Sequence, residues 1–139
     1  MSAELPLCVG DVMTGDVRTI SRMATVAEAI GAMREAGVSS LVVERRDVFD
    51  ELGLIVVTDI AREVVARDRA AERVNVYEVM SKPVLTLPVD MQAKYAVRLL
   101  VRFSVSRALV VDSARAPVGI VTLRDLVLRS TPAGAEAAG

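Results

Sequence analysis

Histidine is absent from this 139-residue sequence, and cysteine occurs once, at Cys8. Without histidine the chain lacks the commonest general base, the commonest metal ligand and any Ser–His or Cys–His nucleophile pair. A single cysteine excludes an intrachain disulfide and a cysteine-based metal cluster. The composition therefore argues against an enzyme, and we expect no catalytic residue, no bound metal and no required cofactor.

A charge excess and long apolar runs are lacking as well. Seventeen basic residues balance eighteen acidic ones, which gives a net charge of -1, whereas a nucleic-acid-binding face normally produces a basic excess. No apolar run approaches the ~18 residues that cross a bilayer. The first residues also lack the basic and then apolar pattern of a secretory signal. We therefore expect a cytoplasmic protein that binds neither nucleic acid nor membranes.

An internal repeat covers most of the chain. An offset of 67 residues aligns Asp11-Val12-Met13-Thr14 with Glu78-Val79-Met80-Ser81, and it aligns Val38-Ser39 with Val105-Ser106. An offset of 66 residues then aligns Gly53 with Gly119 and Asp59 with Asp125. Such ordered matches indicate a duplication, and only two copies favour packing about a pseudo-two-fold axis rather than a solenoid.

Both copies predict the order strand, helix, strand, strand, helix. The expected strands are 17–20, 40–43 and 54–57 in the first copy, and 84–87, 108–111 and 118–123 in the second. Thr25 and Glu28 form a capping box at the first helix, and Asp90 is the expected cap of its counterpart. Because the strands are apolar on both faces, we expect an α/β fold with small sheets packed together and helices outside.

These patterns also suggest boundaries. The first repeat is expected at residues 8–66 and the second at 75–129. The charged segment 67–74 has no clear apolar stripe and is the expected linker between them. The tail 130–139 is rich in small and polar residues and is expected to be disordered.

The string from Gly119 to Asp125 carries the clearest chemistry, because a strand ends there and a helix begins. Free backbone N–H groups and the positive end of the helix dipole attract anions at such a place. Asp125 can accept hydrogen bonds from a ribose diol, and Thr122 can donate to a phosphate or ribose oxygen. The alternative is that Thr122 and Asp125 form an ordinary capping box.

The whole layout resembles a tandem pair of CBS domains, of the stand-alone regulatory type. In the first copy, the residues that carry the resemblance are 11–14, 37–43 and 53–60; in the second, they are 78–81, 105–112 and 119–126. The resemblance covers about residues 8–129. It implies paired clefts between the repeats that bind adenosine-containing ligands, and no catalysis.

The resemblance also implies roles for individual residues. In the second copy Asp125 would hold the ribose, while Thr122 and Arg107 would contact phosphate. Thr86 and, in the first copy, Thr19 would line the adenine pocket, largely through backbone groups.

The first copy departs from this pattern. Asp59 is present, but Val56 replaces the threonine and Ser40 replaces the arginine. The hydroxyl of Thr58 is the only partial substitute. A phosphate site without arginine loses a charge-assisted contact, so we expect one competent site and one weak or empty site.

The expected ligand is an adenine nucleotide, with an AMP-like molecule favoured. AMP, ADP, ATP, NAD and S-adenosylmethionine all share the adenosine group that these residues would read. The sequence shows no additional effector domain, so we expect a partner protein to sense the ligand in trans. The alternative function is a structural or protein-interaction module with degenerate, ligand-free clefts.

A homodimer is expected because the last helix of each repeat has more apolar residues than one face can bury. Leu126, Val127 and Leu128 point in three directions around a helix. An exposed apolar patch of this kind usually marks an interface. The alternative is that a terminal segment of the same chain covers it.

Overall fold

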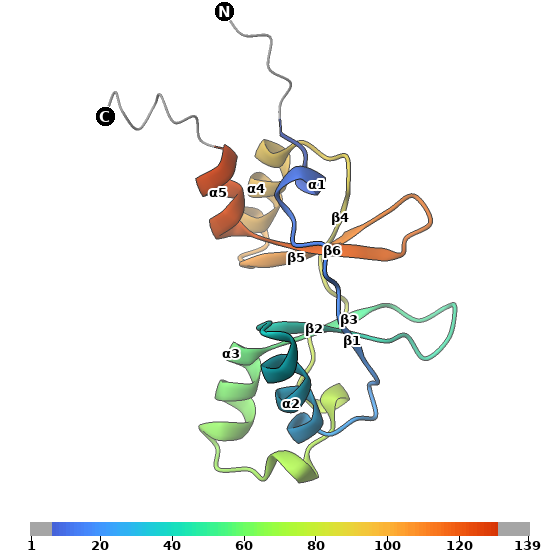
Figure 1. Cartoon of the computed structure of the whole chain (residues 1–139), viewed down its shortest axis with the longest axis vertical. Coiled ribbons are helices and arrows are strands. Elements are labelled where there is room, and N and C mark those ends of the chain that lie inside the picture. The colour runs from blue at the N-terminus through green and yellow to red at the C-terminus, as the bar shows by residue number, and fades with distance from the viewer. Residues whose placement is uncertain (1–6, 131–139) are drawn as a thin grey trace, which may run out of the picture. The chain divides into compact units, whose positions relative to one another are not determined.

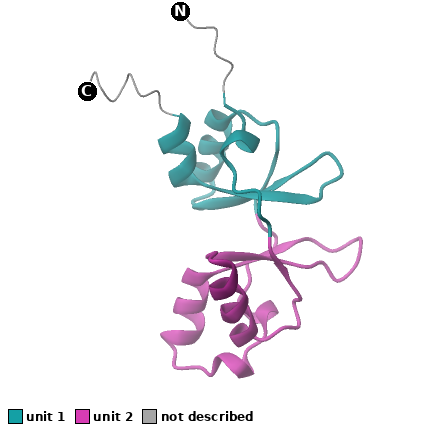
Figure 2. Cartoon of the chain, in the orientation of Figure 1, with its two compact units in different colours: residues 1–17, 85–139 teal, residues 18–84 magenta. Residues whose placement is uncertain are grey.

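The computed structural model describes residues 7–130, which form two compact units (Figure 1, Figure 2). Unit 1 combines the N-terminal residues up to 17 with the residues from 85 onward, and unit 2 is the continuous stretch 18–84. Each unit contains a three-stranded mixed sheet with helices against it, which confirms the predicted α/β class. The predicted disordered tail lies outside the described residues, apart from Ser130, which ends a helix.

Unit 2 contains the first sheet. Its elements are β1 (Thr19–Ile20), α2 (Val26–Ala36), β2 (Ser40–Val43), β3 (Gly53–Val56) and α3 (Val57–Ile60), followed by a π-helical turn (Ala61–Val65) and 3-10 turns at Ala71–Arg73 and Val76–Glu78. β1 runs parallel to β2, and β2 runs antiparallel to β3. The strand predicted at residues 40–43 and the cap at Thr25 are confirmed, since the Thr25 hydroxyl accepts from the Glu28 N–H at 3.1 Å.

Unit 1 contains the second sheet, with the same topology. Its elements are α1 (Val9–Val12), β4 (Thr86–Pro88), α4 (Ala93–Arg102), β5 (Arg107–Val111), β6 (Pro117–Thr122) and α5 (Leu123–Ser130). β4 is parallel to β5, and β5 and β6 form an antiparallel hairpin. The shared topology is the structural counterpart of the internal repeat.

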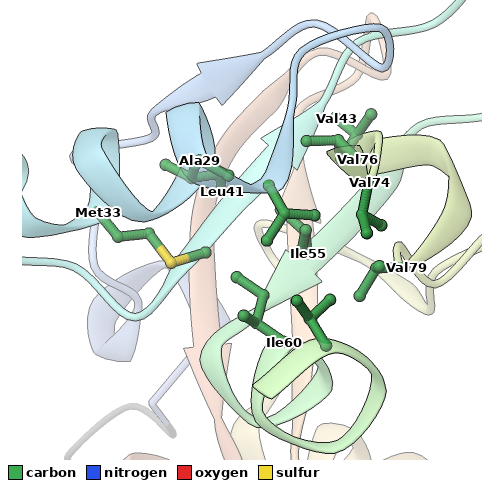
Figure 3. Packing of buried hydrophobic residues seen from close by; sticks show 11 residues of the cluster. Ala29, Met33, Leu41, Val43, Ile55, Ile60, Val74, Val76 and Val79 are labelled. Carbon is green, nitrogen blue, oxygen red and sulfur yellow. The ribbon is translucent and has the colours of Figure 1, made fainter. Parts of the chain in front are cut away.

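One face of each sheet packs against the helices of its own unit. In unit 2, Leu41 and Val43 of β2 and Ile55 of β3 bury their side chains against Ala29 and Met33 of α2 (Figure 3). In unit 1 the alternate residues of β5, Ala108 and Val110, face α4 and α5 in the same way. Because side chains alternate along a strand, the residues between these point to the opposite face of the sheet.

The N-terminal segment of the first repeat completes unit 1, not unit 2. Thr14 and Ile120 exchange both of their backbone hydrogen bonds, at N···O distances of 2.9 and 3.0 Å. Val9 donates its N–H to the carbonyl of Met91 at 2.7 Å, just before α4. The Asp-Val-Met-Thr motif of the first repeat therefore contacts the helix and hairpin of the second repeat.

The matching segment of the second repeat completes unit 2. Leu54 and Ser81 exchange both backbone hydrogen bonds, at 3.0 and 2.8 Å. Val26, the first residue of α2, donates to the carbonyl of Val74 at 2.8 Å. The two repeats have thus exchanged their N-terminal segments.

The exchange gives the segment predicted as a linker a structural role. Residues 67–74 lie entirely within unit 2, and Val74 is buried in its core. The chain passes between the units after Val17 and again after Val84. The spatial units therefore differ from the sequence repeats at both ends.

The exchange also explains why the predicted cap at Asp90 is wrong. α4 begins at Ala93, its N-cap residue is Gln92, and no side chain caps it. The Ala93 N–H instead donates to the carbonyl of Leu7 at 2.8 Å. A backbone acceptor from the distant N-terminal segment has replaced the local side-chain cap.

The long charged loop between β2 and β3 is fixed by one carboxylate. Asp50 pairs with the Lys82 ammonium at 2.5 Å and accepts the Arg46 N–H at 2.8 Å. The hydrogen bond from Lys82, followed by that from the Arg46 backbone, lowers the pKa of Asp50 to about 2. Asp50 therefore remains ionised throughout the ordinary pH range.

Two glycines allow the exchanged segments to approach the sheets. A Cβ at Gly119 would lie 2.4 Å from Sδ of Met13 and 2.9 Å from the carbonyl oxygen of Thr14. A Cβ at Gly53 would lie 2.9 Å from Sδ of Met80. The aligned glycines of the repeat are thus matched to the aligned methionines of the exchanged motifs.

Gly119→Ala is expected to lower the free energy of unfolding by about 1–3 kcal/mol, because overpacking displaces Met13 and the backbone at Thr14. Urea denaturation followed by circular dichroism measures this change. Gly31→Ala in α2 is the matched control, since nothing lies within 4 Å of its Cβ position, and it should stabilise by about 0.5–1 kcal/mol. Equal effects of the two substitutions would contradict the packing assigned to Gly119.

Candidate functional site

Three predicted site residues of the second repeat lie on one face of the unit 1 sheet. Arg107 of β5 pairs directly with Thr122 of β6, so their side chains project to the same side. Thr86 of β4 pairs with Leu109, which points to that same side because it lies two residues after Arg107. All three residues alternate with those that face the helices, so they point away from the hydrophobic core.

The end of β6 leads directly into α5. Thr122 is the last residue of the strand, and its Oγ1 accepts the Asp125 N–H at 3.1 Å. The start of α5 is also bonded to the residue just before β5, because the Leu123 N–H donates to the Ser106 carbonyl at 2.8 Å. The capping interpretation of Thr122 is therefore correct, but a hydroxyl that accepts one bond can still donate its own proton.

Asp125 lies in the first turn of α5, one turn beyond Thr122. Its side chain is 39% exposed, and Oδ1 lies 3.7 Å from a guanidinium nitrogen of Arg124, which is itself largely exposed. This separation is longer than a charge-assisted hydrogen bond, which spans about 2.7–2.9 Å. The carboxylate of Asp125 can therefore accept further hydrogen bonds.

The predicted residues of the first repeat occupy equivalent places in unit 2. Ser40 pairs with Val56 across β2 and β3, and it is a buried polar residue of the strand. Thr19 of β1 pairs with Val42, on the same face as Ser40. Thr58 is exposed in the first turn of α3. At the position that Arg107 holds in unit 1, unit 2 has Ser40, whose hydroxyl carries no charge.

Asp59 differs from Asp125 in having a close partner. Oδ1 of Asp59 lies 2.6 Å from a guanidinium nitrogen of Arg62, and the Asp59 side chain is only 13% exposed. The second repeat has Leu128 at the position that matches Arg62. The carboxylate of the first repeat is therefore held by a short ion pair at 2.6 Å, whereas that of the second has only the longer contact with Arg124 at 3.7 Å.

Sequence reasoning missed Arg62, although its spacing was visible. Residues three apart on a helix are neighbours, so an aspartate followed by an arginine at this distance predicts an ion pair. The same comparison between the two repeats would have shown that only the first one contains the arginine. The asymmetry between the sites is thus greater than the one predicted from Val56 and Ser40 alone.

Within residues 7–130, no three histidine, cysteine, aspartate or glutamate side chains cluster in a way that could hold a metal ion. No helix in this same range has the length and apolar character needed to span a bilayer.

The sequence matches the CBS domain family twice, at residues 9–66 and 76–130. These two matches cover most of the chain, and the order of elements in each unit agrees with the resemblance noted from the motifs. The chain belongs to the CBS domain family, as a tandem pair.

Curated relatives agree with this assignment. Uncharacterized protein MK0525 of Methanopyrus kandleri is 35% identical over 86% of this chain, which spans 60% of that protein. CBS domain-containing protein YhcV of Bacillus subtilis is 32% identical, with 86% of this chain and 83% of the relative covered. The pair of domains accordingly occurs both as most of a protein and as part of a longer one.

Solved structures share the fold. A hexameric CBS-CP12 protein from bloom-forming cyanobacteria has a TM-score of 0.85 and 32% identity, covering 91% of this chain and 73% of that one. The CBS domain of a bacterial CNNM/CorC family Mg²⁺ transporter, solved in complex with ATP, has a TM-score of 0.70 and 27% identity. The match to the transporter domain covers 86% of this chain and 84% of that domain.

Proposed function

We propose that this chain is a non-catalytic regulatory module that binds an adenosine-containing ligand, with an AMP-like nucleotide favoured, at the Arg107–Thr122–Asp125 end of the unit 1 sheet. The observation that carries the proposal is that Arg107 and Thr122 pair across β5 and β6, and that Thr122 caps the helix whose first turn contains Asp125. These three side chains offer a guanidinium for phosphate, a hydroxyl donor and a carboxylate with acceptor capacity. The ATP complex of the similar transporter domain supports the adenosyl class.

The chemistry of each group matches one part of a nucleotide. A guanidinium forms charge-assisted and bidentate bonds with phosphate oxygens. The N-terminal end of α5 adds the positive end of the helix dipole, which also favours an anion. An aspartate at this position accepts from ribose hydroxyls, as acidic residues do in dinucleotide-binding folds.

The first repeat is proposed as the weak or empty site. Arg62 already neutralises and hydrogen-bonds the carboxylate of Asp59 at 2.6 Å. A ribose would have to displace that bond, and Ser40 offers no charge to a phosphate in return. One ligand per chain is therefore the proposed stoichiometry.

The proposal also covers how ligand binding is sensed, the oligomeric state and the location of the protein. Ligand binding would favour one conformation of the module, and a partner protein would sense it in trans. A homodimer formed through exposed helix faces and a cytoplasmic location belong to the same proposal. The transmission to a partner requires that the partner distinguish the liganded from the free state.

Asp125→Ala should weaken binding of AMP or ATP by about 1.5–3 kcal/mol, the usual contribution of hydrogen bonds to a charged group. Isothermal titration calorimetry gives both affinity and stoichiometry. Asp59→Ala is the matched control and should change the affinity little, because its carboxylate is already held by Arg62. If the two variants behave alike, the unit 1 site is not the dominant one.

Arg107→Ala should weaken AMP binding by about 1.5–3 kcal/mol while changing adenosine binding much less, since only AMP carries the phosphate charge. Lys94→Ala removes an exposed charge from α4 and serves as the control for net charge. Equal losses for AMP and adenosine would remove Arg107 from the phosphate site.

A structural module without a ligand is the second candidate, and the paired Asp59 favours it for the first repeat. A thermal-shift panel of AMP, ADP, ATP, NAD and S-adenosylmethionine separates the two functions. A ligand that binds only the folded state raises the melting temperature with its concentration. No shift with any of the five compounds would support the structural role.

A further inference from the structure

One exposed side of α4 carries positive charge that the described part of the chain does not neutralise. Lys94, Arg98 and Arg102 follow one another at intervals of four residues, so they lie along one side of the helix. All three side chains are exposed. Within residues 7–130, none of them forms an ion pair with a carboxylate. These three residues and Tyr95 are called the basic patch of α4 below.

An exposed aromatic ring holds two of the three cations. The Nζ atom of Lys94 lies 5.1 Å from the centre of the Tyr95 ring, and Cζ of Arg98 lies 5.2 Å from it. At these distances the ring attracts both cations. A long side chain that is already held in one place loses less conformational freedom when it binds an anion. The basic patch is therefore partly ordered before any partner binds.

The three cations do not help to stabilise α4. Like charges four residues apart on a helix repel each other. Lys94 lies in the first turn, where the helix dipole disfavours a cation, and no acidic residue occupies that turn. The first repeat has Ala27, Gly31 and Glu35 at the matching positions of α2, in a unit whose sheet has the same topology. The fold therefore does not require the cations, and an external acidic group would relieve their repulsion.

The basic patch faces away from the core of unit 1. α4 buries Ala96 and Leu100. Because successive residues turn by about 100° around a helix, Arg98 and Arg102 lie nearly opposite these two residues. The expected homodimer depends instead on apolar residues of α5, and the basic patch contains none of them. The patch is thus a separate exposed surface.

The spacing and number of the cations indicate the kind of partner. Four residues advance an α-helix by about 6 Å, so carboxylates four residues apart on a second helix would match the basic patch. A nucleic-acid-binding surface commonly makes about 6–10 phosphate contacts. A cluster that binds anionic membranes commonly has about four to eight basic residues. With three cations on a chain of net charge -1, an acidic protein segment is the favoured partner.

We propose that the basic patch of α4 binds a helical segment of a partner protein that carries carboxylates at intervals of about four residues. The inference rests on the proposed function, because it names the chemistry of the partner that would sense the ligand in trans. Its position supports this role. α4 ends at Arg102, shortly before β5 begins at Arg107, and α4 packs against α5, which contains Asp125.

Titration of the isotope-labelled full chain with a synthetic peptide tests the proposal by nuclear magnetic resonance. The probe is an alanine-rich peptide of about 20 residues, since shorter helices are marginal in water, with glutamate at every fourth position. A control peptide has glutamine in place of each glutamate. At low salt the glutamate peptide should shift the backbone amide signals of α4, and the glutamine peptide should not. Raising the salt concentration should weaken the binding.

The double variant Arg98→Gln/Arg102→Gln should bind the glutamate peptide roughly three- to tenfold more weakly, because two exposed ion pairs are lost. Glutamine has nearly the helix propensity of arginine, so α4 should remain folded. Arg34→Gln/Arg73→Gln is the matched control, since it removes the same charge from exposed positions of unit 2. Equal losses in the two double variants would overturn the proposal.

Two further probes test the class of partner, and sedimentation equilibrium tests the separation from self-association. Binding of a single-stranded oligonucleotide or of phosphatidylserine vesicles to the basic patch, more tightly than the glutamate peptide, would overturn the assignment to a protein. A smaller mass for Arg98→Gln/Arg102→Gln than for the unchanged chain would overturn it too, because the patch would then belong to a contact between copies.

The same labelled sample separates this inference from the proposed function. Peptide shifts confined to α4, and weakened in the Arg98→Gln/Arg102→Gln variant alone, support the acidic partner. AMP shifts at β5 and α5 without peptide shifts at α4 overturn the acidic partner and leave ligand binding in place. Peptide shifts without AMP shifts support the basic patch as a docking surface and contradict the adenosyl ligand.

Discussion

The close approach of each exchanged segment to a glycine is the contact on which the rest of the structure depends. Met13 lies over Gly119, and Met80 lies over Gly53, with paired backbone hydrogen bonds beside each contact. Each sheet has only three strands, so the exchanged segment supplies part of the apolar cover that the unit's own helices do not provide. Val9 and Val12 are core residues of unit 1, and Val74, Val76 and Val79 are core residues of unit 2. The exchange therefore decides the composition of both cores.

The duplication has conserved the scaffold more closely than the chemistry at the strand ends. Both sheets have the same topology and the same bridges to the exchanged segments. The residues at the start of the last helix have diverged instead. In the first repeat Arg62 forms an ion pair with Asp59. The second repeat has Leu128 at the matching position, so the carboxylate of Asp125 can bind other donors. The residue three positions after the aspartate thus distinguishes a carboxylate held by a short ion pair from one that can bind other donors, within two sheets of the same topology.

Much of the fold could be predicted from the sequence, because the interactions that determine its strands and helix caps are local. The apolar run at residues 40–43 and the cap at Thr25 depend on residues within a few positions, and both were confirmed. The exchange could not be predicted, because the motif at residues 11–14 fits the hairpin of either repeat equally well in sequence. The wrong cap at Asp90 has the same origin, since the acceptor that replaced it comes from Leu7, far away in the chain. The ion pair of Asp59 could have been predicted, because Arg62 lies three residues after Asp59 on the same helix face.

The exchange also has a consequence for the order in which the protein folds during synthesis. Unit 2 is continuous from residue 18 to residue 84, so all of its strands and helices have emerged before the second sheet is complete. Unit 1 is discontinuous, so its N-terminal segment meets Val89 and Met91 only after unit 2 has been translated, and it meets β6 and α5 later still. Contacts between such distant parts of a chain close slowly, and domains fold as units as they leave the ribosome. Unit 2 is therefore expected to form first, before the N-terminal segment finds its partners in unit 1.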